Sequence, residues 1–366
     1  MARQRIALLG GHGGRSGVPR HIHQLCNLLS DRADITVFSD INDGGYDFTS
    51  DLNVNHVVIP GLSTTLNPAR LTRVWRTFCA ALDTQDPFDV LWAHARLSLP
   101  MARRFVRKAP IPPRLIATYH GSPFAGRSAP QLALARKVER DGLTKSLPHD
   151  LVFLSQTDRA TFSGLPLHRH TIHEIANCSD LGALPPLRQP LHPTVMMTTR
   201  ASRQKNLYAA ARIFGQLPND YRLILRGMET DTFVRSQFMR ILGDKICQRI
   251  TFGGPISDVR PDLVAADCYL LTSHYEGLSI GALEAFEAGL PVAMPQIGGA
   301  HEFSTHHPQS AIIDPRRPVQ SANALHQLVS TFRDNRTVHV VQNRAAWSKT
   351  FHPSIWAIKI NTLLNA

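Results

Sequence analysis

Residues 5–40 read RIALLGGHGGRSGVPRHIHQLCNLLSDRADITVFSD. The apolar runs at 5–10 and 34–40 are typical of buried strands, and segment 18–30 between them has the periodicity of an amphipathic helix. A glycine cluster at 10–17 joins the first strand to the helix. This order predicts two parallel strands connected by a helix.

The same alternation continues to about residue 290. Apolar strands separated by helical segments imply parallel sheets that are covered on both faces, so the expected fold class is α/β. Further strands are expected at 54–60, 89–94, 114–120, 151–155, 171–177, 194–199, 221–227, 249–254 and 268–273, and further helices at 66–82, 97–108, 205–216, 231–243 and 280–288.

The segment LGALPPLRQPLHP (181–193) interrupts this pattern. Its four prolines disfavour both a regular helix and a central strand, so we expect an interdomain linker there. A length of 366 residues also suggests two domains. We expect the first Rossmann-like domain at 1–180, the linker at 181–193 and the second Rossmann-like domain at 194–340.

The chain is basic. It has 40 Lys and Arg against 28 Asp and Glu, a formal net charge of +12, which attracts nucleic acid, anionic lipid or phosphorylated metabolites. Aromatic residues make up only 7%, and the interleaved aromatic and basic residues of RNA-binding sheets are missing, so we expect no nucleic-acid partner. Five scattered cysteines without a CxxC pair indicate neither a disulfide framework nor a zinc ribbon.

The sequence also bears on where the protein is located in the cell and on whether it binds a metal ion. No apolar run reaches the ~18 residues of a membrane span, and the apolar start is too short for a signal peptide, so a cytoplasmic protein is expected. His21 and His23 would point to different faces of a helix, and His306 and His307 fall in a polar segment without further ligands. We expect no metal site.

The glycine cluster is the first candidate site. Gly13 and Gly14 would let a ligand approach the backbone at a helix start, where free N–H groups attract an anion. The cluster does not match GxGxxG in any frame, and a tight turn explains it about as well.

Asp40 after the next strand resembles the ribose carboxylate of dehydrogenases, but without the glycine fingerprint a nicotinamide enzyme is a weak alternative.

The second candidate site is SHYEGLSIGALEAFEAGLPV (273–292). Glu276 would lie in the loop after a strand, and Glu284 on a helix that begins near Ser279. The N–H groups of Leu278, Ser279 and Ile280 could hold a diphosphate between these two carboxylates. A carboxylate, a set of N–H groups and a second carboxylate, in that order, suit the sugar hydroxyls, the phosphates and the ribose hydroxyls of a sugar nucleotide. The structural alternative is an ordinary capped helix with a solvated Glu284.

This stretch resembles the retaining GT-B glycosyltransferases of family 4, the group 1 glycosyltransferases, whose E-x7-E motif reads EGxxxxxLEAxxxGxPV. In that family the first Glu contacts the donor sugar and the second binds the ribose hydroxyls, so the resemblance gives these roles to Glu276 and Glu284. The segment IGGAHEF (297–303) is similar to the family's GGxxE segment. Further agreements are Gly277, Ala285, Gly289, Pro291 and Val292.

Two more segments are similar to family motifs. Arg200 and Lys205 are spaced as in GRxxxxKG, although Thr199 and Asn206 replace its glycines, and they would neutralise the leaving diphosphate. A solvated basic loop is the alternative. His120 in TYHGS matches a histidine that approaches the donor sugar in the family, and a turn-capping histidine is the alternative.

The resemblance implies a GT-B fold with two facing Rossmann-like domains and a central cleft, in which the donor binds mostly to the second domain and the acceptor to the first. It also implies that helices at 341–366 cross back onto the first domain. Their apolar residues would then be docked. These residues are Ile355, Trp356, Ile358, Ile360 and Leu363.

The implied activity is retaining transfer of a hexose or hexosamine, without metal, from a UDP-, GDP- or ADP-sugar to a glycan or lipid-linked acceptor in cell-surface polysaccharide or glycoconjugate synthesis. The four cations of RRFVRK (103–108) are either a solvated helix face or a peripheral contact with an anionic membrane at its inner face. A nucleotide-sugar epimerase of the same fold and a non-catalytic sugar-nucleotide-binding subunit remain alternatives.

Overall fold

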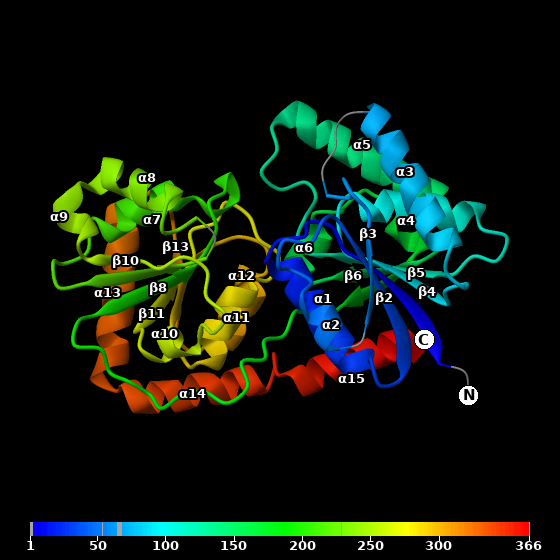
Figure 1. The fold of residues 1–366 in the computed structure, drawn as a ribbon. Helices are drawn as coiled ribbons and strands as arrows, with labels where there is room; N and C mark the ends of the chain where they lie inside the picture. The colour runs from blue at the N-terminus through cyan, green and yellow to red at the C-terminus, as the bar shows by residue number, and fades with distance from the viewer. Residues whose placement is uncertain (1–2, 53, 64–67, 228, 366) are drawn as a thin grey trace. The chain divides into compact units, whose positions relative to one another are not determined.

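The computed structural model describes residues 3–52, 54–63, 68–227 and 229–365. These residues form two compact units, 1–175 and 176–366. Each unit has a parallel β-sheet with helices on both faces (Figure 1). The expected fold class, α/β with two Rossmann-like domains, is therefore confirmed.

The first unit has a seven-stranded sheet of order β3-β2-β1-β4-β5-β6-β7. Its strands are β1 (Gln4–Leu9), β2 (Ala33–Ser39), β3 (Asn55–Val58), β4 (Val90–Ala93), β5 (Arg114–Tyr119), β6 (Asp150–Phe153) and β7 (Thr171–Glu174). Its helices are α1 (Gly17–Leu29), α2 (Phe48–Asp51), α3 (Pro68–Asp83), α4 (Ser98–Lys108), α5 (Ala129–Lys145), α6 (Gln156–Ala160) and the 3₁₀ turn η1 (Leu167–Arg169).

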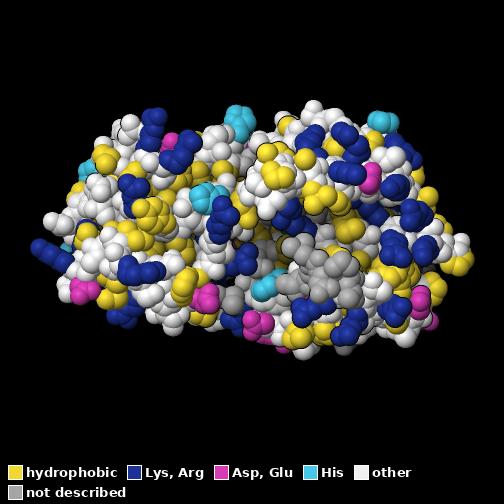
Figure 2. All heavy atoms as spheres, turned by 90° about the horizontal axis from the view of Figure 1, so that it is seen from above, with side chains coloured by type: hydrophobic (Ala, Val, Ile, Leu, Met, Phe, Trp, Pro, Cys, Tyr) yellow, Lys and Arg dark blue, Asp and Glu magenta, His cyan; other side chains and the backbone are white. Residues whose placement is uncertain are grey.

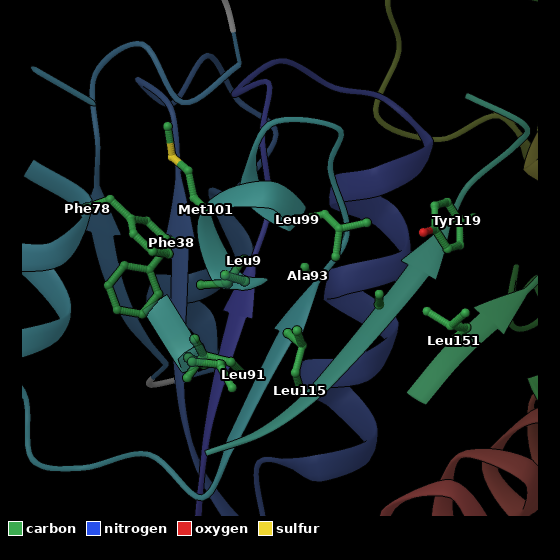
Figure 3. Close-up of a cluster of buried hydrophobic side chains, with 14 of the residues drawn as sticks. Leu9, Phe38, Phe78, Leu91, Ala93, Leu99, Met101, Leu115, Tyr119 and Leu151 are labelled. Atoms are coloured by element: carbon green, nitrogen blue, oxygen red, sulfur yellow. The ribbon is translucent and has the colours of Figure 1, made fainter. Parts of the chain in front are cut away.

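The β1 side chains explain why this sheet needs helices on both faces. Ala7 and Leu9 pack in a cluster with Phe78 of α3 and Met101 of α4 (Figure 3). Because strand side chains alternate between faces, Ile6 and Leu8 point to the opposite face, where they too are fully buried. A strand that is apolar on both faces is stable only between two helical layers.

The second unit has a six-stranded sheet of order β10-β9-β8-β11-β12-β13. Its strands are β8 (Thr194–Thr198), β9 (Arg222–Arg226), β10 (Ile250–Phe252), β11 (Cys268–Leu270), β12 (Val292–Pro295) and β13 (Ser310–Ile313). Its helices are η2 (Arg203–Lys205), α7 (Leu207–Phe214), α8 (Phe233–Leu242), α9 (Asp244–Cys247), α10 (Arg260–Val264), α11 (Ile280–Glu287), α12 (Ala300–His306), α13 (Pro318–Asp334), α14 (Arg336–Ser348) and α15 (Pro353–Asn365).

Most expected elements lie within a few residues of the observed ones. Segment 181–193 contains neither helix nor strand, as its prolines predict. The expected helix 66–82 corresponds to α3, although residues 66–67 lie outside the described residues. No expectation covered the two 17-residue helices α5 and α13, or the strands β12 and β13. The crossing of residues 341–366 back onto the first domain stays a prediction.

Three expectations about side chains were wrong. Ile358 is 66% exposed, because it lies on the outer side of α15 while Trp356, Ile360 and Leu363 are buried. His307 is buried beyond the end of α12 and stacks on Phe286, so it does not belong to a polar loop. Arg103 is buried as well, so its charge is missing from the outer face of α4.

Arg103 turns inward because α5 supplies it with an acidic partner. Its guanidinium donates to Glu139 at 2.8 Å and to the hydroxyl of Tyr119 at 2.9 Å. This ion pair compensates the cost of burying the charge.

Within the described residues, no helix is both long enough and apolar enough to span a membrane.

Candidate functional site

The candidate residues lie at the carboxyl ends of the strands, where the strand order of each sheet reverses. In the second unit the chain builds outward from β8 through β9 to β10, and then from β11 to β13 on the other side. The loops after β8 and β11 therefore meet, and open α/β sheets bind ligands at such a point. The first loop carries Arg200 and Lys205, and the second carries Glu276.

These two loops are joined by a cluster of hydrogen bonds around Glu276. The Lys205 ammonium lies 2.6 Å from Oε1 of Glu276, and the Ser273 hydroxyl donates to the same oxygen at 2.7 Å. Oε2 accepts a hydrogen bond from the Gln204 amide at 3.3 Å. Arg200 donates to the Gln204 side chain at 3.5 Å. The sequence did not predict the contact of Lys205 with Glu276. With 18% of its side chain exposed, Lys205 does not belong to a solvated loop, and its role toward a diphosphate stays a prediction.

The two departures from the GRxxxxKG motif have a backbone explanation. Asn206 has a left-handed φ of 48°, a conformation that glycine adopts freely and that asparagine tolerates better than most other residues. Thr199 is not among the described non-glycine residues with positive φ, so it needs no glycine. The loop thus keeps a left-handed turn directly after Lys205 without the family's second glycine.

Helix α11 begins at Ile280, with Ser279 as its N-cap, as the sequence predicts. The Ser279 hydroxyl accepts a hydrogen bond from the Ala282 N–H at 3.5 Å. Glu284 is only 2% exposed, because nearly the whole of α11 is buried. The alternative of a solvated Glu284 is therefore wrong. Its carboxylate is enclosed one turn behind the N–H groups of the helix start.

Tyr269 of β11 lies beneath this helix start. Its hydroxyl is 2.6 Å from that of Thr198, and a Cβ on Gly281 would lie 2.4 Å from it. Burial, with the nearby charges of Glu284 and Glu276, raises the pKa of Tyr269 far above its ordinary value. The phenol is therefore protonated at neutral pH, and both carboxylates lie within its electrostatic reach.

The Glu276 loop rests on the glycine pair of the IGGAHEF segment. Gly298 has a φ of 43°, and a Cβ there would lie 2.0 Å from the carbonyl oxygen of Glu276. The Gly299 N–H donates to the Gly277 carbonyl at 3.0 Å. These contacts require a residue without a side chain at 298, which explains the resemblance to the GGxxE segment in physical terms.

A side chain at position 298 should therefore disturb both the fold and the site. We expect Gly298→Ala to lower the free energy of unfolding by about 1–3 kcal/mol and to weaken binding of a sugar nucleotide, because it displaces Glu276. The matched control is Gly243→Ala, where φ is 74° and nothing lies within 4 Å of the added Cβ. Denaturant unfolding and donor titration of both variants check this. Equal behaviour of the two variants would contradict it.

In the first unit, the glycine cluster has a structural reason of its own. A Cβ on Gly13 would lie 1.8 Å from the carbonyl oxygen of Ile41, and the Gly13 carbonyl accepts hydrogen bonds from Asp43 and Gly45. The tight-turn interpretation thus suffices for Gly13. A role of Gly13 and Gly14 in donor binding stays a prediction.

Asp40 is part of the same loop packing and is already engaged. Burial opposes its charge, but hydrogen bonds from the Ser63 hydroxyl and from the N–H groups of Gly61, Ile41 and Ser63 hold its pKa below its ordinary value. These donors occupy the carboxylate, which removes the support for a ribose-binding role.

His120 directly follows β5, as expected, and it belongs to a group of three histidines. His94, directly after β4, has its Nδ1 3.2 Å from Nε2 of His120, and His21 of α1 packs edge-on against His120. Burial lowers the pKa of both His94 and His120 well below its ordinary value, so both rings are uncharged at neutral pH. The sequence interpretation considered His21 only beside His23 and missed this group.

Sequence reasoning also missed the residues that hold Glu276 in place and the tyrosine near both carboxylates. Gln204 and Ser273 lie within the quoted motifs, but their partners become visible only when the two loops meet. In the sequence, Tyr269 is one of several apolar residues of an expected strand, and nothing distinguishes it from the others. Its position between two small residues of the facing elements, Thr198 and Gly281, cannot be seen in the sequence pattern.

The comparisons with known proteins agree with this geometry. Residues 192–331 match the family model described as Glycosyl transferases group 1, and residues 16–178 match the model described as Glycosyl transferase 4-like domain. Together these two models account for most of both units, and the chain belongs to the group 1 glycosyltransferases.

A curated relative and two solved structures are similar to parts or all of the chain. A stretch of 139 residues is 27% identical to the lipopolysaccharide core biosynthesis glycosyltransferase LpsE of Rhizobium meliloti, and it spans 38% of this chain but only 40% of that protein. HepE of Anabaena, solved in complex with UDP and glucose, has a TM-score of 0.77 and 17% identity over 99% of this chain and 100% of its own.

Sucrose-phosphate synthase from Thermosynechococcus elongatus has a TM-score of 0.76 and 19% identity, over 99% of this chain and 98% of its own. At these identities the similarity concerns the fold. It confirms the expected GT-B fold class.

Proposed function

We propose that this protein is a retaining glycosyltransferase, which moves a hexose or hexosamine from a nucleoside-diphosphate sugar to a glycan or lipid-linked acceptor in polysaccharide or glycoconjugate synthesis. The observation that carries the proposal is the contact of Lys205 with Glu276 beside the start of α11. The UDP and glucose bound to HepE and the biosynthetic role in the name of LpsE support the substrate class.

We assign a role in the proposed reaction to each of the polar groups at the start of α11. The N–H groups of Leu278, Ser279 and Ile280, just before and at the start of α11, bind the diphosphate, since a helix start is electropositive. Buried Glu284 accepts hydrogen bonds from the ribose hydroxyls. Glu276 accepts hydrogen bonds from the sugar and orients it. No covalent nucleophile is required, because the acceptor hydroxyl enters on the face from which the phosphate leaves.

The cations act on the leaving group. As the glycosidic bond breaks, negative charge grows on the diphosphate, and Lys205 and Arg200 stabilise that charge. We propose that these two side chains and the helix start take the place of a divalent ion, so that transfer continues in EDTA. The role of His120 toward the donor sugar stays an expectation from the family resemblance.

Two alternatives differ in what happens to the donor when no acceptor is present. An epimerase would convert the sugar nucleotide into a second one, and a non-catalytic binding subunit would leave it unchanged. Proton NMR of the enzyme with UDP-, GDP- and ADP-sugars separates them. Transferase function predicts slow hydrolysis to a nucleoside diphosphate and a free sugar that is released as the donor's anomer, and a new sugar nucleotide would contradict it.

The same protein carries a basic face on its first unit. Exposed Lys and Arg side chains gather on α3, α4 and α5, interspersed with apolar ones (Figure 2). On α5, Leu134 is 63% exposed and Val138 is 56% exposed, one helical turn apart. We propose that this face binds anionic lipid peripherally. Its basic residues are Arg73, Arg76, Arg104, Arg107, Lys108, Lys137 and Arg140.

Vesicle flotation at moderate salt tests the membrane proposal. We expect the wild type to float with vesicles that contain anionic lipid, and the triple variant Arg104→Glu, Arg107→Glu, Lys108→Glu to stay behind, because each cation near such a surface contributes about 1 kcal/mol. The control reverses three exposed cations of the second unit, Arg235, Arg240 and Lys245. Equal flotation of both triple variants would contradict the assignment to this face.

A further inference from the structure

Three histidines from three different elements converge inside the first unit. His21 comes from α1, His94 follows β4 and His120 follows β5. One ring nitrogen from each can be chosen so that all three lie within 4.8 Å of one another. His21 and His94 are each 2% exposed, while His120 is half-buried. Imidazoles gathered in this way are an arrangement that metalloproteins use.

We infer that His21, His94 and His120 form a binding site for a divalent transition-metal ion, with Zn²⁺ as the expected ion. The spacing supports this directly. Two nitrogens bound tetrahedrally to zinc at about 2.0–2.1 Å lie about 3.3–3.4 Å apart. Nδ1 of His94 and Nε2 of His120 are 3.2 Å apart and share a hydrogen bond. An ion can bind both nitrogens after a small adjustment, once the proton between them moves to the other nitrogen of its ring by way of solvent.

The donor set determines the class of ion. Imidazole nitrogens suit Zn²⁺, Co²⁺, Ni²⁺ and Cu²⁺, whereas Mg²⁺ and Ca²⁺ prefer oxygen ligands. Three imidazoles leave a fourth position open for water, as in zinc sites with three protein ligands. Half-buried His120 provides the side from which an ion or a water molecule enters.

The surroundings of His94 add a second observation. Its ring stacks on Trp92, and among the described residues its Nε2 has no hydrogen-bond partner although the atom is fully buried. Buried polar atoms without partners are rare, and an ion or water is one reason for them. The two nitrogens of an imidazole point in different directions, so an ion on Nδ1 of His94 leaves the ring proton on Nε2. The orphaned Nε2 therefore shows that this buried ring is not held by hydrogen bonds from the described residues on that edge, and the ligand geometry rests on the distances between the three rings.

A bound ion would also affect catalysis, and this consequence rests on the proposed function. An ion on Nε2 of His120 occupies a nitrogen that could contact the donor sugar. We therefore expect Zn²⁺ to inhibit transfer, which is compatible with transfer that needs no metal. The site lies in the first unit, so this ion is distinct from one that would bind the diphosphate beside α11 of the second.

Titration with Co²⁺ tests the site without any sugar nucleotide. The full chain without an affinity tag is treated with EDTA, dialysed and titrated while the visible absorption is recorded. We expect one equivalent of Co²⁺ to give the intense bands of a four- or five-coordinate ion, and Zn²⁺ but not Mg²⁺ to remove them. His94→Gln and His21→Asn should each weaken binding by at least ~10–100-fold, the cost of losing even an outer-shell partner.

The control is His23→Asn, on the same helix as His21. His23 stacks on Phe48 and lies outside the cluster, so this variant should bind Co²⁺ like the wild type. Circular dichroism melts verify that each variant is folded. Weak octahedral bands in the wild type, or equal affinity of the wild type and folded His94→Gln, would overturn the inference. Because no donor is used, failure of the transferase proposal would leave this result unchanged.

Discussion

Replacing Lys205 by methionine is expected to slow release of the nucleoside diphosphate from the donor by about 100–1000-fold, the range found when one preorganised donor to a developing charge is removed. Lys205 is the cation that the structure places in direct contact with Glu276, and its side chain is only 18% exposed. Methionine keeps the length of the aliphatic chain and removes the charge, so packing is largely preserved.

In Lys205→Met, the partners that remain for the Glu276 carboxylate among the described residues are Ser273 and Gln204. In the proposed mechanism the sugar is then oriented less well, which adds to the loss of charge at the leaving group. The matched control is Lys245→Met, since Lys245 is exposed on α9. Release of the nucleoside diphosphate is measured at saturating donor for both variants. A rate for Lys205→Met within a factor of about three of the control would contradict the role.

Glu284→Gln is expected to weaken donor binding by about 10–150-fold. A hydrogen bond to a charged group contributes about 1.5–3 kcal/mol, and each 1.4 kcal/mol is a factor of ten in affinity. Glutamine is nearly isosteric, so enclosed Glu284 loses its charge without leaving a cavity. Because the proposed ribose contact would be made before and during the reaction, we expect the donor Kd to rise more than kcat falls.

Calorimetric titration with the donor measures this change. Asp244→Asn serves as the control, because Asp244 is an exposed carboxylate of the same unit at the start of α9. Donor affinity of Glu284→Gln equal to that of the control would remove Glu284 from the donor site. A loss confined to kcat would instead place Glu284 in the chemical step and contradict its assignment to the ribose.

The fold was predictable because its main determinants are local. Strand β1 is apolar on both faces and is followed by glycines and an amphipathic helix, and this pattern recurs through both units. Helix α5 escaped prediction for a related reason. Leu143 is its only fully buried residue, and Leu134 and Val138 face outward, so its sequence lacks a continuous apolar stripe.

The candidate site was predictable only in part. Glu276 and Glu284 are close in sequence, so their spacing on a loop and a helix could be read directly. Contacts between segments that are far apart in the sequence could not be predicted in this way. The pairing of Lys205 with Glu276 and the meeting of His21 with His94 depend on which strands lie side by side in the sheet. Sequence periodicity contains no such information.

The most direct test of the central claim is the thermal stability of the wild-type protein with UDP-, GDP- and ADP-sugars in the presence of EDTA. Ligand at about 100 times its Kd adds ~2.7 kcal/mol to the stability of the folded state. We predict that one nucleotide class raises the melting temperature and that EDTA does not remove the effect. No shift with any sugar nucleotide, or a shift that disappears in EDTA, would contradict a metal-independent donor site in this protein.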